Sequence, residues 1–201
     1  MPLYSRIALV AGALLFLAPA SNAQIQTYVA NLSGLAEDTP NNSSGTGFST
    51  VTLNLGANTM RVQISFTGLG SNTTASHIHS ATATPLTGAV GVATQTPTFP
   101  GFPAGVTAGT YDQTFDMTLA SSYNPAFVTA NGGTALTARD ALFAGIAGQR
   151  AYVNIHTTQF PGGEIRGFLV AAPEPGSLAL LGGIAAVGLP LIAARRRRRT
   201  A

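Results

Sequence analysis

Alternation of apolar and polar residues is the clearest pattern in the middle of the chain. In residues 50–55 apolar side chains alternate with threonine and asparagine, and residues 60–66 repeat the alternation. Successive side chains of a strand point to opposite faces, so each run predicts a strand with one buried face. The Gly-Ala-Asn sequence at residues 56–58 favours a turn between them. The two runs are therefore predicted to form an antiparallel hairpin.

A second hairpin is predicted near the end of the patterned region. In residues 152–157, His156 shares a face with tyrosine and asparagine, and valine and isoleucine occupy the opposite face. The Pro-Gly-Gly sequence at residues 161–163 is a turn signal, after which residues 164–170 resume the alternation of a strand.

The other two histidines belong to a His-Ile-His unit. Strand geometry places His77 and His79 on one face and directs Ile78 to the opposite, apolar face. All three histidines are thus predicted on the polar faces of their strands, and we expect His156 to meet the His-Ile-His unit.

The remaining pattern indicates short strands and little helix. Further strands are predicted at residues 27–32, 88–92 and 115–119. Residues 94–109 are rich in proline, glycine and threonine and predict a long loop. Residues 138–147 have apolar side chains at helical spacing and end at Gly148, so they predict one short helix. The expected fold is all-β, an antiparallel Greek-key β-sandwich or barrel of about seven or eight strands with this helix.

Both ends of the chain differ from the body, which we place at residues 24–172. Residues 1–23 combine Arg6, an apolar run and a Ser-Asn-Ala cleavage pattern, and they predict a secretory signal peptide.

The tail, residues 173–201, has three parts. It begins with Pro173, Glu174 and Pro175, and residues 176–194 that follow are uncharged and mostly apolar. About 20 apolar residues span a bilayer, so this segment predicts a C-terminal transmembrane helix. Five arginines close the tail and are expected to stay in the cytoplasm. They are Arg195, Arg196, Arg197, Arg198 and Arg199.

The charge of the body excludes a nucleic-acid-binding role. The chain has a formal net charge of +3, but five of its ten basic residues belong to the terminal arginine block. The body has four arginines and six acidic residues, a net charge of −2. A nucleic-acid footprint requires a basic patch on the folded domain. Cysteine is absent from the sequence, so disulfides and thiolate ligands are excluded and any metal must be bound by nitrogen or oxygen.

The three-part tail resembles the PEP-CTERM sorting signal of Gram-negative bacteria. The resemblance covers residues 173–201 and depends on the Pro-Glu-Pro motif, the apolar span and the arginine block. It implies an exosortase-type membrane enzyme as a partner and transient anchoring in the inner membrane. The expected destination is the cell surface, the outer envelope or an extracellular polysaccharide matrix.

The body resembles the CHRD domain, which is named after chordin and also occurs in secreted bacterial proteins. The residues that carry the resemblance are 30–34, 77–79, 152–157 and 161–167, and the last two blocks are the most specific. The resemblance implies no settled biochemical activity.

The histidines have two interpretations. Imidazole suits Cu and Zn, and three histidine ligands with an open fourth position form a known metal site, so His77, His79 and His156 are candidate ligands. The arrangement is similar to the copper site on the β-sandwich of Cu/Zn superoxide dismutases. However, the chain has no fourth histidine for a bridging ligand. Alternatively, the three imidazoles only form hydrogen bonds to their neighbours and complete a polar face.

The sequence favours a binding or structural role over an enzyme. It contains no Ser-His-Asp order, paired-carboxylate signature or phosphate loop, and Glu164 and Arg166 are expected to form surface ion pairs with Arg150 or Asp140. We expect a structural or binding protein of the envelope or matrix, with polysaccharide or envelope proteins as partners. The alternatives are a Cu or Zn metalloprotein and a protein-binding module.

Overall fold

The computed structural model describes residues 25–173. The predicted signal peptide, the rest of the Pro-Glu-Pro motif, the apolar span and the arginine block lie outside the described residues. Within residues 25–173, no helix has the length and apolar character that a membrane crossing requires.

Four long strands form the first layer. They are β1 (Ile25–Ser33), β2 (Thr46–Asn54), β3 (Thr59–Thr67) and β5 (Gly109–Asp116). β2 and β3 pair antiparallel with Val51 opposite Val62, which confirms the predicted hairpin. β1 pairs with the other edge of β2, and β5 pairs with the other edge of β3.

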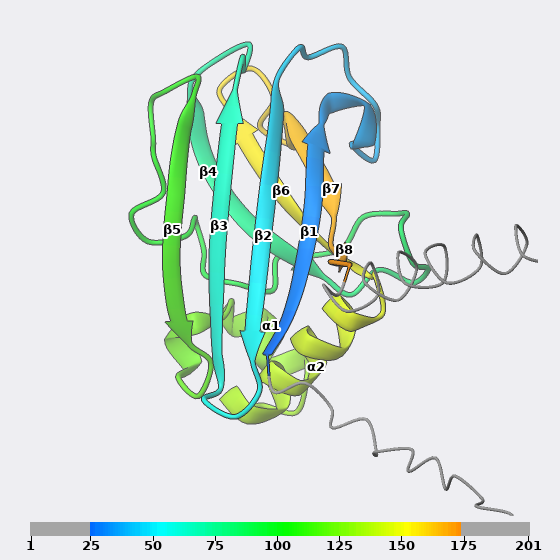
Figure 1. Ribbon diagram of the computed structural model, residues 1–201, viewed down its shortest axis with the longest axis vertical. Coiled ribbons are helices and arrows are strands. Elements are labelled where there is room, and N and C mark those ends of the chain that lie inside the picture. The colour runs from blue at the N-terminus through cyan, green and yellow to red at the C-terminus, as the bar shows by residue number, and fades with distance from the viewer. Residues whose placement is uncertain (1–24, 174–201) are drawn as a thin grey trace, which may run out of the picture.

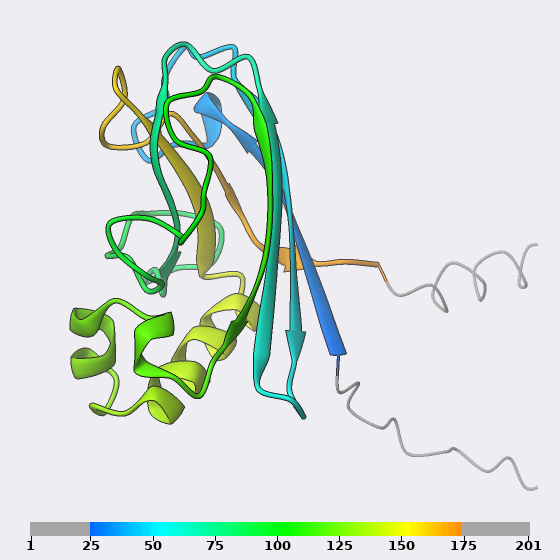
Figure 2. The same cartoon turned by 90° about the vertical axis from the view of Figure 1, so that its left-hand side faces the viewer.

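The second layer contains the histidines. It is formed by β4 (Thr73–Ser80), β6 (Ala151–Thr157) and β7 (Ile165–Phe168), and the short β8 (Val170–Ala171) pairs with β1. β6 and β7 are the predicted second hairpin. One continuous antiparallel sheet has the order β4-β6-β7-β1-β2-β3-β5, and it bends between β7 and β1 into a half-barrel (Figure 1). The two layers face each other in profile (Figure 2).

The apolar faces of the two layers form the core. Ile78, Val153 and Ile155 are fully buried on the second layer, opposite buried side chains such as Val51 and Val62 on the first. Burial of each such side chain contributes about 1.5–3 kcal/mol. Because Ile78 points into this core, its neighbours His77 and His79 point to the outer side of the second layer, as strand alternation predicts.

Helices close one end of the sandwich, and there are more of them than the sequence predicts. The described residues contain α1 (Pro125–Ala130), α2 (Ala135–Ala147) and two 3₁₀ turns, η1 (Gly34–Ala36) and η2 (Ala120–Ser122). α2 is the predicted helix and is capped by Gly148, but it begins three residues earlier because Thr134 and Thr137 form a capping box. The predicted short helix is confirmed in α2, and the six-residue α1 is an addition that the sequence does not predict because it is too short to show a helical period.

Two predicted strands differ from the structure. Residues 88–92 form no strand beyond a single bridge between Val92 and His79, because this segment crosses the histidines instead of joining the sheet. The strand predicted at residues 115–119 is the end of β5, which stops at Asp116. There the Asp116 carboxylate accepts hydrogen bonds from the backbone N–H and hydroxyl of Thr118 and turns the chain.

Candidate functional site

The three histidines meet on the outer side of the second layer. β4 and β6 are antiparallel neighbours, with His77 opposite Asn154 and Ala75 opposite His156. The ring centroids are 4.7 Å apart for His77 and His156 and 5.3 Å apart for His77 and His79. One ligand nitrogen from each histidine lies within 4.8 Å of the other two. The expectation that the two stretches meet is confirmed.

A backbone carbonyl holds each imidazole. The Nε2–H of His77 donates to Pro97 O at 2.9 Å, and the Nδ1–H of His79 donates to Val90 O at 2.7 Å. The Nδ1–H of His156 donates to Pro161 O at 2.9 Å. Because a carbonyl only accepts, these bonds fix the tautomer of each ring and leave a lone pair on its other nitrogen.

The three remaining ring nitrogens have no hydrogen-bond partner. They are His77 Nδ1, His79 Nε2 and His156 Nε2, and all three are buried. Most buried polar side-chain atoms have a partner, and each one left without costs about 1–3 kcal/mol. Three such atoms in one cluster indicate that hydrogen bonding alone does not explain the arrangement.

The imidazoles are neutral at physiological pH. The pKa of His77 is lowered to about 4, mainly by burial and to a smaller extent by the neighbouring His156 and His79. Burial also lowers the pKa of His79 to about 4 and is the main cause that lowers the pKa of His156. Neutral imidazole is the form that ligates metals, so protons do not compete for these nitrogens near pH 7.

Arg166 extends the site, contrary to the predicted surface pair. Its guanidinium lies 4.7 Å from the ring centroid of Tyr152, and this ring is stacked on His79 at 4.7 Å. Arg166 is 4% exposed and donates to the carbonyls of Ala36 and Gly88.

The carboxylates beside Arg166 are those of Glu37, at 3.9 Å, and Asp38, at 3.7 Å, and not the predicted partner Asp140. Burial raises the pKa of Glu37 to about 7, against the opposing charge of Arg166.

Glu164 is also buried, so the predicted surface position is wrong for this residue too. Its carboxylate accepts hydrogen bonds from the Ser43 hydroxyl, the Gly70 backbone N–H and the Thr157 hydroxyl, each at 2.6 Å. These donors come from the segment before β2, the loop after β3 and the end of β6. Glu164 therefore joins three segments at one end of the sandwich and is a structural residue.

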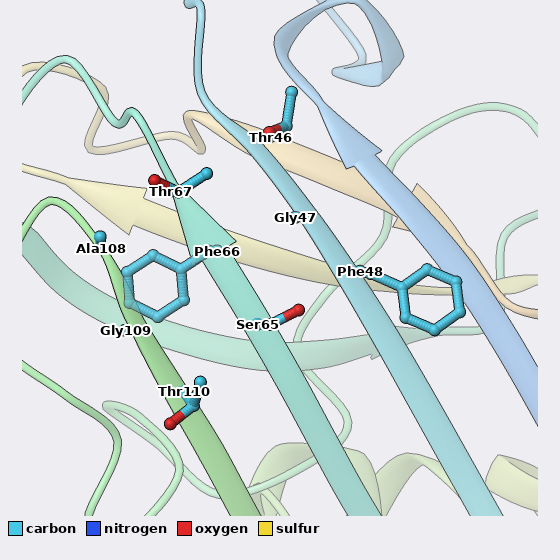
Figure 3. A pocket seen from close by; sticks show the side chains of 9 residues that line it. All are labelled: Thr46, Gly47, Phe48, Ser65, Phe66, Thr67, Ala108, Gly109 and Thr110. Carbon is cyan, nitrogen blue, oxygen red and sulfur yellow. The ribbon is translucent and has the colours of Figure 1, made fainter.

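A shallow recess lies on the outer face of the first layer. It covers parts of β2, β3 and β5, and its lining contains hydroxyls and aromatic rings but no titratable side chain. Phe48 projects from β2 toward β1 and is 43% exposed, with Ser65 as its neighbour on β3 and Thr110 beyond Ser65 on β5 (Figure 3). Proton transfer and metal ligation have no suitable group here, but a neutral ligand could bind.

A comparison with known families identifies the family of the body of the chain. The family model of the CHRD domain matches residues 28–169, which is more than half of the chain. The chain belongs to the CHRD family. Membership supports an extracellular or binding module, and all three histidines lie within the matched part of the CHRD domain. Comparison with curated proteins and with solved structures gave no match.

Sequence reasoning located the histidines but missed their surroundings. The carbonyls of Val90 and Pro97 belong to the segment between β4 and β5, where main-chain groups leave no signature in the sequence. The long loop predicted at residues 94–109 does lie over the histidine face through Pro97. The alternation in residues 152–157 did place Tyr152 on the same face as His156, and this was the available signal for the ring that is stacked on His79.

Proposed function

We propose that the CHRD domain binds one Cu or Zn ion through His77, His79 and His156. The observation that carries the proposal is the cluster of three buried ring nitrogens without partners, on imidazoles whose other nitrogens donate to backbone carbonyls. Metal-bound histidines characteristically donate their second ring N–H to such an acceptor, which fixes the ring for ligation. A bound ion would give all three lone pairs a partner.

The spacing of the cluster suits a small contraction on binding. With metal–nitrogen bonds of about 2.0–2.1 Å, ligand nitrogens in a tetrahedral site lie roughly 3.4 Å apart. The present spacing of up to 4.8 Å requires only small side-chain movements. Three protein ligands with one further position is the arrangement of many catalytic zinc sites, so the centre could also present a bound water or substrate.

Elemental analysis tests the metal proposal. The purified protein is loaded with Cu or Zn and desalted, and we expect about one ion per chain in the wild type. The triple variant H77Q/H79Q/H156Q is expected to retain no ion, because an amide can donate to the carbonyls but is a poor ligand. Circular dichroism checks that the variant is folded, and S65A on the opposite face is the matched control. Equal metal content in wild type and triple variant would contradict the proposal.

We further propose that the domain acts outside the cell, in the envelope or polysaccharide matrix. Membership of the CHRD family is consistent with secretion. The proposal that the protein is exported depends on the leader pattern of residues 1–23. The proposals of an exosortase-type partner and of a transient inner-membrane anchor depend on the sorting pattern of residues 173–201. Removal of residues 173–201 is expected to change the sorting of the protein and to leave metal binding by the domain unchanged.

The recess on the first layer supports neutral polysaccharide as a second candidate ligand. An exposed Phe48 ring among threonine and serine hydroxyls offers an apolar platform with flanking hydrogen-bond groups. The nearby charges of Arg61 and Asp112 are paired with each other at 2.5 Å, so they favour no ionic ligand.

Replacement of Phe48 tests the polysaccharide candidate. In affinity electrophoresis through gels that contain dextran or hydroxyethyl cellulose, wild type is expected to be retarded and F48A to bind roughly tenfold more weakly. L136A, which removes a similarly exposed apolar side chain from α2, is expected to behave as wild type. Absence of retardation with neutral glucans would remove this candidate and leave the metal centre untouched.

A further inference from the structure

The ligand set of the histidine cluster carries no negative charge. Each imidazole is a neutral donor whose second nitrogen bonds to a neutral carbonyl. Among residues 25–173, the cluster of candidate ligand atoms consists of these three histidines without a carboxylate. A divalent ion bound here keeps its full double charge, because no ligand neutralises it.

The surroundings add positive charge. Arg166 lies against Tyr152, which is stacked on His79, so two successive spacings of 4.7 Å separate the guanidinium from the imidazole. The carboxylates of Glu37 and Asp38 lie beside Arg166, at 3.9 Å and 3.7 Å, and Asp38 is half exposed. Of these three charged groups, Arg166 is the one that acts on His79, where it adds to the lowering of the pKa by burial.

Burial makes the charge of the ion decisive. His77, His79 and His156 are 7%, 9% and 8% exposed. The Born cost of moving an ion out of water grows with the square of its charge, so it is roughly four times larger for a double than for a single charge. A neutral, buried donor set thus favours a monovalent ion over a divalent one.

The number of ligands also favours a monovalent ion. Zinc is almost always four-coordinate, and Cu(II) prefers square-planar or tetragonal sites, so each would complete its coordination with at least one ligand from solvent in addition to the three imidazoles. Cu(I) has a filled d shell without a geometric preference and accepts three nitrogen donors. Imidazole is a suitable ligand for copper.

We propose that the histidine cluster is a Cu(I) site that binds Cu(I) more tightly than Cu(II) or Zn(II). This inference depends on the proposed metal-binding function and specifies the oxidation state of its ion. Export of the chain would then make it a module that holds reduced copper outside the cell.

Competition titrations test the preference. The purified full-length protein, in detergent buffer, is titrated without oxygen with Cu(I) and ascorbate against bicinchoninate, and separately with Cu(II) and Zn(II) against chelating indicators. We expect 1:1 binding of Cu(I), with a Kd at least roughly 100-fold below that for Cu(II). X-ray absorption is expected to show three nitrogen ligands. Equal or tighter binding of Cu(II) or Zn(II) would overturn the Cu(I) inference and leave the metal site standing, whereas no retained ion of any kind would overturn both.

Variants of Arg166 test the electrostatic argument. R166M removes the guanidinium charge and is expected to reduce the ratio of the Cu(II) to the Cu(I) Kd by roughly tenfold, as estimated for one unit charge about 10 Å from the ion. R166K keeps the charge and is expected to keep the ratio. Neither variant has the guanidinium fork that donates to the carbonyls of Ala36 and Gly88, so a purely structural effect would change the ratio in both variants and contradict the electrostatic role.

Discussion

Replacement of Glu164 with leucine is expected to lower the free energy of unfolding by about 4 kcal/mol. The carboxylate is fully buried and accepts three short hydrogen bonds. Leucine fills a similar volume but leaves the Ser43 hydroxyl, the Gly70 N–H and the Thr157 hydroxyl without their acceptor. Loss of several buried hydrogen bonds at once is among the few mechanisms that produce such large effects.

Urea denaturation followed by circular dichroism measures the effect of Glu164. T157V removes one of the three donors and is expected to lose about 1–2 kcal/mol. D140N changes an exposed carboxylate and is expected to stay within about 0.5 kcal/mol of wild type. If E164L were as stable as D140N, the three hydrogen bonds would contribute nothing to the fold.

Replacement of Gly167 with alanine is expected to lower the free energy of unfolding by about 3 kcal/mol. A Cβ atom on Gly167 would lie 2.2 Å from the carbonyl oxygen of Asn31 and 2.9 Å from its carbonyl carbon. Both atoms belong to the backbone of β1, so the clash cannot be relieved by a change of rotamer. The expected consequence is a displacement of β7 from β1 where the sheet bends between its two layers.

Gly162 offers the matched control for Gly167. It lies in the turn between β6 and β7, and a Cβ atom there would meet no atom within 4 Å. G162A is therefore expected to be neutral or slightly stabilising, because alanine restricts the unfolded chain. Thermal denaturation of the two variants compares them directly, and equal melting temperatures would show that the close approach of β7 and β1 is not required.

The sheet was predictable where strands have one apolar and one polar face. The hairpin of β2 and β3 and the hairpin of β6 and β7 follow from alternation and turn residues alone. Residues 88–92 also alternate, but their backbone groups serve the histidine face through Val90, and only the tertiary structure shows this. The short helix α1 depends on its Asn124 cap and on packing against α2, which a single sequence does not reveal.

The meeting of the three histidines was predictable from the sequence, and the charged residues around them were not. Strand geometry placed His77, His79 and His156 correctly because two of them share one strand face and the third belongs to a recognisable strand. Glu164 and Arg166 were expected at the surface because charged residues usually lie there. Their partners Ser43, Gly70 and Glu37 are more than 90 residues away in the chain, so no local pattern announces the pairing.

The acceptors that orient the imidazoles are main-chain atoms, and this has an evolutionary consequence. Every amino acid has a main-chain carbonyl, so a substitution of Val90, Pro97 or Pro161 does not by itself remove the acceptor that orients an imidazole. Selection on the site therefore acts on three histidines and on the lengths of the surrounding loops, while the loop sequences are free to diverge. A CHRD domain that has lost the proposed centre is then expected to differ in the three histidines or in the lengths of these loops, and not in the identity of the loop residues.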